Sequence, residues 1–281
     1  MTPIEFMLVT GLISVVAGLL GSILGLGGGI VVIPALTLGM GVNMRFAIGA
    51  SIVSVIATSS GAAAAYVREH LANIRLAMFL EVATTAGAVG GAFLAGKIPS
   101  LWLQRIFGVL MAYAALMMIL QQRQQMIRTT TSTPRPDRLA DQLELHSSYY
   151  DQQRGSIVHY RVTRSRLGLV FSTLAGAVSG LLGVGGGIIK VPVMTLVMNV
   201  PIKAATATSN FMIGVTAAAS AGVYFLRGDV DPFIAAPVVL GITAGATLGS
   251  RLLGKMRSAW LRYLFVIILL IVCVQMLIKK G

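Results

Sequence analysis

Apolar residues run through this chain in long blocks that contain no charged side chain. The blocks without charge are residues 6–44, 46–67, 167–189, 204–226 and 232–250. About 20 apolar residues cross the hydrocarbon layer of a bilayer as a helix, so these blocks have transmembrane length. The pattern therefore predicts an all-α polytopic membrane protein with about 8–10 membrane segments.

One sequence pattern occurs twice in the chain. The segment LGLGGGIVVIPALTLGM begins at Leu24, and LGVGGGIIKVPVMTLVM begins at Leu182, an interval of 158 residues. The same interval relates Trp102 to Trp260. Such self-similarity indicates two pseudo-symmetric repeats, each of which is one structural unit. The predicted divisions are a first membrane repeat, a polar linker and a second membrane repeat: residues 1–120, 121–166 and 167–281.

Each repeat contains a glycine-rich interruption. In both repeats the first span ends at the glycines, and an apolar element of about a dozen residues follows, which is too short to span comfortably. Irregular backbone at membrane depth needs surrounding protein or a water-filled cavity, so we expect a broken or re-entrant helix that lines a cavity there. Three further apolar helices follow, predicted in the first repeat at 46–66, 76–96 and 103–120. Paired interruptions in two halves indicate a binding site.

Composition and charge narrow the class of protein. Hydrophobic residues make up 56% of the chain and charged residues 11%, which argues against a water-soluble domain. The net charge of +13 is compatible with nucleic-acid binding. The basic residues, however, lie at the ends of apolar segments or in the linker, as topology-setting charges do. We therefore expect a lipid bilayer and no nucleic acid as partner.

The distribution of Lys and Arg predicts the orientation. If each repeat crosses five times, the linker and most basic turns face the cytoplasm, and the two repeats are inverted relative to each other. Four crossings plus a hairpin would leave the repeats parallel and would put a strongly basic segment outside. We favour inversion, although Lys279 and Lys280 would then lie outside.

The linker between the repeats is polar and basic. It carries eight Arg, four acidic residues and the two histidines His146 and His159. The linker is interpreted first as a solvated tether that positions the two halves. The alternative is that the segments LELHSSYY and SIVHYRVT on either side of Gly155 pair as a small cytoplasmic hairpin. The histidines are too few for a metal site, and the lone Cys273 excludes a disulfide.

The glycine runs themselves are candidates for anion binding. Backbone N–H groups of a glycine-rich turn that opens a helix can converge on an anion, assisted by the helix dipole. The alternative is that the glycines only permit a kink and close helix packing. The candidate residues are Gly25, Gly27, Gly28 and Gly29 in the first repeat and Gly183, Gly185, Gly186 and Gly187 in the second.

Polar residues distinguish the second repeat from the first. Lys190 stands where the first repeat has Val32. A lysine at membrane depth costs about 2.5–3.5 kcal/mol, so it faces a partner or a wet cavity unless it reaches the headgroups. Helical spacing places three polar residues on one side, where they would bind substrate oxygens or else a neighbouring helix. These are Thr206, Ser209 and Asn210, together with Ser51, the counterpart of Ser209 in the first repeat.

Glu81 is the only acid within an apolar span and away from its ends. A carboxylate inside the membrane is a functional candidate, here as a proton carrier. The alternative is an ion pair with Arg75 or Lys190 that serves assembly. The Gly87-x-x-x-Gly91 pair, by contrast, is typical of a helix-packing seam.

Four segments of the chain resemble a known family: GSILGLGGGIVVIPAL, GLLGVGGGIIKVPVM, ATATSNFMIGVTAAAS and the linker piece LHSSYYD. They are similar to the sulfite exporter TauE/SafE family, also called the toluene sulfonate uptake permeases. The resemblance spans essentially the whole chain, with its glycine motif at 25–34 and 183–192. It implies a plasma-membrane carrier of small sulfur-containing anions such as sulfite, sulfonates or thiosulfate.

Together these features predict a secondary transporter for a small sulfur-containing anion, with proton coupling and alternating access between the repeats. We expect no metal and no cofactor. A homodimer is one of the oligomeric states that the sequence allows. An enzyme is disfavoured because the spans lack paired aspartates, a serine with a histidine and the H-E-x-x-H motif. The alternatives are an anion channel, a carrier of a non-sulfur organic anion, and a membrane sensor that relies on the linker.

Overall fold

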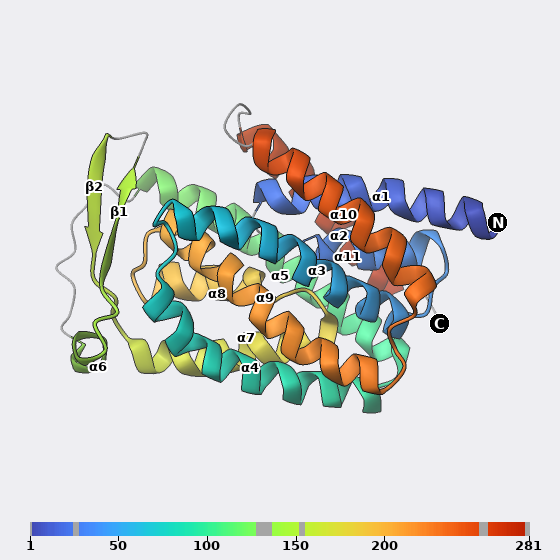
Figure 1. The fold of residues 1–281 in the computed structure, drawn as a ribbon, viewed down its shortest axis with the longest axis horizontal. Helices are drawn as coiled ribbons and strands as arrows, with labels where there is room; N and C mark the ends of the chain where they lie inside the picture. Colours follow the sequence, from blue (N-terminus) through green and yellow to red (C-terminus); the bar gives the residue numbers. More distant parts are fainter. Residues whose placement is uncertain (1, 25–27, 128–136, 152–154, 253–257, 279–281) are drawn as a thin grey trace.

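In the part of the chain that it describes, the computed structural model has helices and one small hairpin, which lies in the linker (Figure 1). It describes residues 2–24, 28–127, 137–151, 155–252 and 258–278. Residues 25–27, which include Gly25 and Gly27, lie outside the described part of the chain.

The first half begins with a helix that is followed by a short return element. The helix α1 (Pro3–Leu24) precedes α2 (Gly29–Pro34), which runs into one π-helical turn, η1 (Ala35–Gly39). The α2 and η1 segments together are the short apolar element that the sequence predicts. Three long helices follow: α3 (Met44–Arg68), α4 (Ile74–Lys97) and α5 (Ser100–Ile127).

The second half has the same order of elements. Its members are α7 (Ser165–Leu182), α8 (Gly187–Pro192), the π-helical turn η2 (Val193–Val197), α9 (Ile202–Leu226), α10 (Pro232–Leu252) and α11 (Ser258–Ile278). Gly187 begins α8 as Gly29 begins α2, and Ile202 begins α9 as Met44 begins α3, each 158 residues later.

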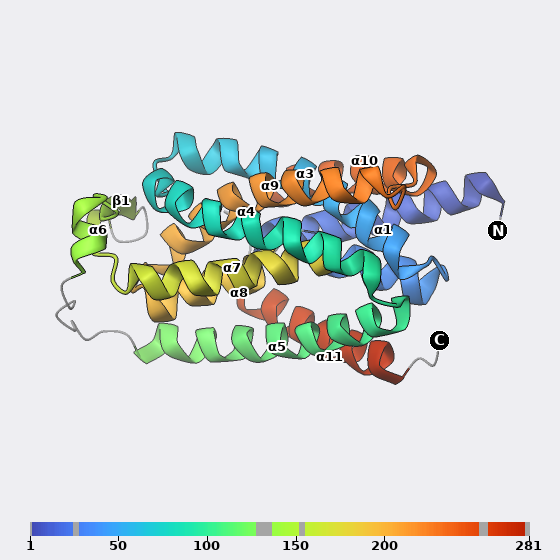
Figure 2. The ribbon, with the colours of Figure 1, turned by 90° about the horizontal axis from the view of Figure 1, so that it is seen from below.

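Helices of the two halves pack in an exchanged arrangement. The helix α1 lies along α10 of the other half, and α7 of the second half lies along α4 of the first. The helix α3 packs on α9, and α5 packs on α11. Figure 2 shows α5 and α11 side by side on one flank of the bundle. Each half therefore buries its first helix mainly against the other half.

Five described helices are long and apolar enough to cross a bilayer. They include Ile74–Lys97, Ser100–Leu120 and Ile202–Leu226. Shorter apolar helices, among them Gly29–Gly39 and Gly187–Val197, accompany them. The lengths and composition are those of a multi-pass membrane protein. Both ends of the chain lie at one end of the bundle, and the hairpin lies at the opposite end (Figure 1).

Glycines form the seam between α4 and α7. A Cβ atom at Gly87 or Gly91 would overlap the backbone carbonyl of Thr173 or Ala177 on α7. On the α7 side, Gly180 lies equally close to the carbonyl of Ala88. The predicted packing role of the Gly87-x-x-x-Gly91 pair is thereby confirmed, since only glycine allows the backbones to approach this closely.

The linker contains a short helix and a hairpin. These are α6 (Arg138–Gln142), β1 (Ser147–Asp151) and β2 (Ser156–Tyr160), and the antiparallel register pairs Ser147 with Tyr160. Asn73, the N-cap of α4, donates to the carbonyl of Leu145 and to the Tyr160 hydroxyl at 2.8 and 3.2 Å. The hairpin is thus fastened to the helical bundle, and of the two interpretations of the linker the hairpin is the one confirmed.

Candidate functional site

The side chain of Lys190 points into the protein. Lys190 lies on α8, directly after the glycine break, and only 2% of its surface is exposed. The alternative that it reaches the lipid headgroups is therefore wrong. A buried ammonium group needs hydrogen-bond acceptors and a counter-charge, because transfer out of water is costly.

Thr216 and Glu81 supply these partners. The Lys190 ammonium donates to the hydroxyl oxygen of Thr216 at 2.7 Å, and the same oxygen lies 2.7 Å from Oε1 of Glu81. The other carboxylate oxygen of Glu81 is 4.0 Å from the Lys190 nitrogen. The three side chains form one buried cluster, called here the Lys190 cluster. Of the proposed ion pairs for Glu81, the one with Lys190 is present.

Two further hydroxyl groups surround the carboxylate of Glu81. Thr85 donates to Oε1 at 3.1 Å, and Thr84 lies 3.4 Å from Oε2. Glu81 itself is only 9% exposed. Arg75, the other basic partner considered for Glu81, instead pairs with Glu144 at the surface. Within a predicted membrane span, Oε1 of Glu81 thus accepts from Thr216 and Thr85, whereas the Thr84 hydroxyl beside Oε2 is 2.7 Å from the carbonyl of Leu80, its nearer acceptor.

The Lys190 cluster joins the two halves of the chain. Glu81 belongs to α4 in the first half, whereas Lys190 and Thr216 belong to α8 and α9 in the second. The two halves are joined in the cluster by the hydrogen bond from Thr216 to Glu81 and by the 4.0 Å approach of Lys190 to Glu81.

The break before α8 depends on glycine at left-handed positions. Gly183, Gly185 and Gly186 have φ angles of 68°, 77° and 73°, which disfavour residues with a Cβ. Gly183 ends α7, and α8 starts again at Gly187. A Cβ at Gly186 would lie 3.4 Å from Cε of Lys190, so the lysine side chain runs alongside the break.

The two glycine regions meet at Ser51. The Ser51 hydroxyl donates to the carbonyl of Gly183 at 2.8 Å. Gly29, at the start of α2, is packed against the same hydroxyl, and a Cβ there would overlap it. Gly28 is equally enclosed, by Ile242. The described glycines of both breaks therefore lie in tightly packed protein in this conformation, with Ser51 between them.

The predicted polar face of α9 is buried but does not bond to Lys190 in the described part of the chain. Ser209 and Asn210 are buried, whereas Thr206 is half-buried. The hydroxyl of Ser209 is buried without a hydrogen-bond partner. Their neighbour Thr208 accepts a hydrogen bond from the backbone N–H of Asn73 at 3.0 Å and so joins α9 to the start of α4.

A model of a known protein family matches residues 10–276 of the chain, under the description "Sulfite exporter TauE/SafE". The chain belongs to this family.

Two curated relatives are similar along nearly their whole length. A Bacillus subtilis protein described as "Probable membrane transporter protein YunE" is 26% identical over 276 residues, which are 96% of each chain. A probable membrane transporter protein of Haemophilus influenzae is 26% identical over 300 residues, covering 98% of this chain and 99% of its own. No solved structure shows a significant match to the chain.

Sequence reasoning about this TauE/SafE protein missed Thr216, Thr84 and Thr85. Thr216 has a counterpart, Thr58, at the interval of 158 residues, but a shared threonine is no sign of an ion-pair bridge. The sequence marks Lys190 and Glu81 as unusual because of their charge, whereas a hydroxyl between them is ordinary inside membrane helices. Their meeting depends on α4 packing against α9, which the sequence does not reveal.

Among the described residues, no three His, Cys, Asp or Glu side chains cluster as metal ligands would. The Lys190 cluster itself contains a carboxylate, a bridging hydroxyl and an ammonium group.

Proposed function

We propose that this TauE/SafE protein is a secondary transporter that moves a small sulfur-containing anion, together with a proton, across the plasma membrane. Membership of the family supports transport and the class of substrate. The observation that carries the proposal is the buried Lys190, whose counter-charge is the carboxylate of Glu81.

Proton coupling follows from charge balance in the Lys190 cluster. With Glu81 ionised, the ammonium of Lys190 is already compensated and has little attraction for an anion. When a proton neutralises Glu81, Lys190 becomes an uncompensated buried cation, which is unfavourable until an anion replaces the lost charge. Proton and anion therefore bind more strongly together than separately, which is the thermodynamic basis of coupled transport.

The glycine break supplies the place where such an anion would bind. Lys190 runs alongside Gly186, so an anion attracted to the ammonium would lie close to the backbone of the break. The Ser51, Thr206, Ser209 and Asn210 side chains are the proposed further donors. Because the breaks are closely packed here, the structure corresponds in this proposal to a closed state, and substrate binds after the two halves shift.

Alternating access is supported by the arrangement of the halves. Their elements recur at one interval, and the exchanged contacts are symmetric: α1 with α10 corresponds to α7 with α4. The termini and the hairpin lie at opposite ends (Figure 1), as an odd number of crossings in each half requires. We therefore propose inverted repeats that rock against each other, with the linker in the cytoplasm because of its arginines.

The test is transport by the purified chain in proteoliposomes. Uptake of labelled sulfite or sulfoacetate should saturate, accelerate in counterflow, and increase when a proton gradient is imposed in the same direction. Lys97→Val, which removes an exposed lysine of α4, serves as the control, and Lys190→Val should abolish uptake. Unitary currents without saturation would show a channel instead. Saturable uptake that does not change with the proton gradient would contradict the coupling of anion transport to protons.

A further inference from the structure

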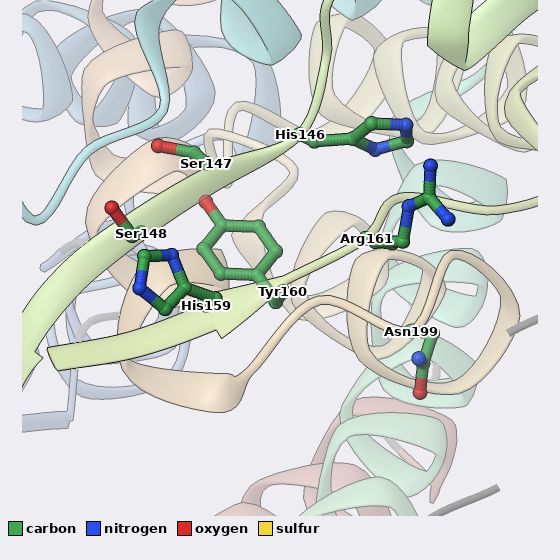
Figure 3. Close-up of a pocket in the computed structure, with 7 residues that line it drawn as sticks. All are labelled: His146, Ser147, Ser148, His159, Tyr160, Arg161 and Asn199. Atoms are coloured by element: carbon green, nitrogen blue, oxygen red, sulfur yellow. The ribbon is translucent and has the colours of Figure 1, made fainter. Parts of the chain in front are cut away.

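A cavity lies at the surface, outside the helical bundle, between the linker hairpin and the loop that follows η2. Its volume is about 590 Å³, within the range of small-molecule sites. Figure 3 shows side chains from both strands and from the loop around it. The lining residues, which define the hairpin pocket, are His146, Ser147, Ser148, His159, Tyr160, Arg161 and Asn199.

The lining of the hairpin pocket is rich in hydrogen-bond donors and contains no carboxylate. Arg161 brings a guanidinium group, the serines bring hydroxyls, and Asn199 brings an amide. His159 of β2 is the register partner of Ser148 on β1, so the two side chains share one face of the hairpin. Guanidinium, hydroxyl and amide groups together are suited to the oxygens of an anion.

The four acidic residues of the linker already have partners. Asp141 accepts from His146 at 2.7 Å and from Arg161 at 3.4 Å. Asp151 accepts from Lys203 at 2.7 Å, and Glu144 pairs with Arg75. Asp137 accepts from the backbone N–H groups of Leu139 and Ser165. Asp141 thus compensates part of the charge of Arg161, and an anion in the pocket would be bound by His159 and by the remaining guanidinium N–H groups of Arg161.

Asn199 gives a second, independent indication. It has a φ angle of 59°, and the residue 158 positions earlier, Gly41, has a φ angle of 68°. The two halves thus use the same left-handed turn after η1 and η2, which glycine adopts without cost. Asparagine tolerates this conformation, but the turn itself does not require an asparagine side chain. The second half has a side chain where the first has none, and that side chain lines the hairpin pocket.

The hairpin pocket is also held in shape. Its hairpin is fastened to the bundle by Asn73, and the backbone N–H of Thr163 donates to the carbonyl of Met198 at 3.1 Å, next to Asn199. The His146 ring is fixed on both sides, because Nδ1 accepts from the N–H of Val162 at 3.0 Å. A site whose walls are already positioned loses less conformational entropy on binding.

The geometry points to the hairpin pocket as a binding site for a small molecule that carries a sulfonate, sulfate or phosphate group. Arg161 and His159 would hold the anionic oxygens, and Asn199 would complete the donors. The loop that contributes Asn199 is continuous with η2 and α8, so a bound anion would bridge the linker and the broken helix of the second half. This inference does not depend on which molecule crosses the membrane.

Binding is tested with inorganic sulfate and with sulfoacetate, by calorimetry on the full chain in detergent. To remove the proposed transport site, the starting protein carries Glu81→Val and Lys190→Val together. Arg161→Gln should weaken the remaining binding at least tenfold, and Arg166→Gln, which removes an exposed arginine outside the pocket, should not. Asn199→Gly, which copies the first half, should weaken binding severalfold without lowering the Tm.

Two results would overturn the inference. The first is an affinity for sulfate and sulfoacetate that Arg161→Gln leaves unchanged. The second is an equal loss of affinity in Arg161→Gln and Arg166→Gln, as expected for general charge attraction. Nanodiscs distinguish a free anion from a lipid headgroup. Equal sulfate affinity in neutral and anionic lipid would identify a free anion as ligand. Competition by anionic lipid that requires Arg161 would identify a headgroup with the same oxyanion chemistry.

Discussion

The ammonium nitrogen of Lys190 and the carboxylate of Glu81 approach to 4.0 Å inside the bundle, although 109 positions separate them in the chain. The first half has Val32 at the position of Lys190, and the second half has Val239 at the position of Glu81. Each half thus contributes one charge to the pair where the other half has valine. The molecule therefore provides its own apolar replacements for both residues.

Replacement of each charge by its valine counterpart separates assembly from transport. Lys190→Val or Glu81→Val alone leaves one buried charge without its partner, at a cost of about 3–5 kcal/mol. The double variant removes both charges, and we expect it to be more stable than either single variant. Thermal unfolding of the detergent-solubilised protein measures the order of stability, and proteoliposome uptake should be lost in all three. A double variant that transports normally would restrict the pair to a structural role.

Thr216→Val tests the bridging hydroxyl. The substitution keeps the shape of the side chain but removes the acceptor of the Lys190 hydrogen bond, and an unmet buried hydrogen bond costs about 1–3 kcal/mol. We expect at least a tenfold loss of uptake. Thr216→Ser should retain most activity because the hydroxyl stays.

The first half offers a matched control for this experiment. Among the described residues, Thr58, the counterpart of Thr216, donates to backbone carbonyls of its own helix alone, at 3.0 and 3.2 Å. Thr58→Val should therefore leave uptake nearly unchanged. Equal losses in Thr58→Val and Thr216→Val would show that the effect comes from general helix packing.

Gly180→Ala tests the seam between α4 and α7. The added methyl group would overlap the carbonyl of Ala88, and forcing the helices apart should cost about 1–3 kcal/mol. Gly90→Ala on α4 meets no atom within 4 Å and should instead stabilise the helix by about 0.5–1 kcal/mol. Opposite shifts of the Tm in the two variants are the expected result, and equal shifts would contradict the seam.

We expect the stability of the junction between the linker and α7 to depend on pH through the carboxyl group of Asp137. Partial burial raises the pKa of its carboxyl, but hydrogen bonds from Ser165, Ala140 and Leu139 outweigh this and lower it below the usual 3.8. Because the pKa is lower in the folded state, this stabilisation is complete above pH 3.8 and is lost as the pH falls through the folded-state value. Hydrogen exchange of the Ser165 amide should accelerate in that acidic range. Asp137→Asn should reduce the dependence on pH.

The sequence was informative where a residue conflicts with its surroundings. A charge within an apolar run identified Lys190 and Glu81, and clustered glycines predicted both the break before α8 and the seam of α4. The order of helices followed from apolar length. The linker hairpin was indicated, as an alternative, by two segments on either side of Gly155. In each case the signal is local, because it depends on neighbouring positions in the chain.

The long-range contacts had no such signal. Small and apolar residues pack equally well on many helix faces, so the choice of α10 as the partner of α1 leaves no distinct pattern in the sequence. The bridge of Thr216 and the bond from Asn73 to Thr208 depend in the same way on the packing of α4 on α9. The hairpin pocket depends on where the linker meets the loop after η2. The sequence also predicted an open cavity at the glycines, whereas Gly183 and Gly29 are closely packed around Ser51.

The exchanged packing of α1 on α10 and of α7 on α4 has a consequence for how the chain can be divided. A fragment that ends in the linker would present the face of α4 to lipid without α7, and the other fragment would lack α1 in the same way. Two such fragments, synthesised together, would interlock through these faces without any covalent connection. Protease cleavage of the linker should accordingly leave a nicked protein that still migrates as one particle.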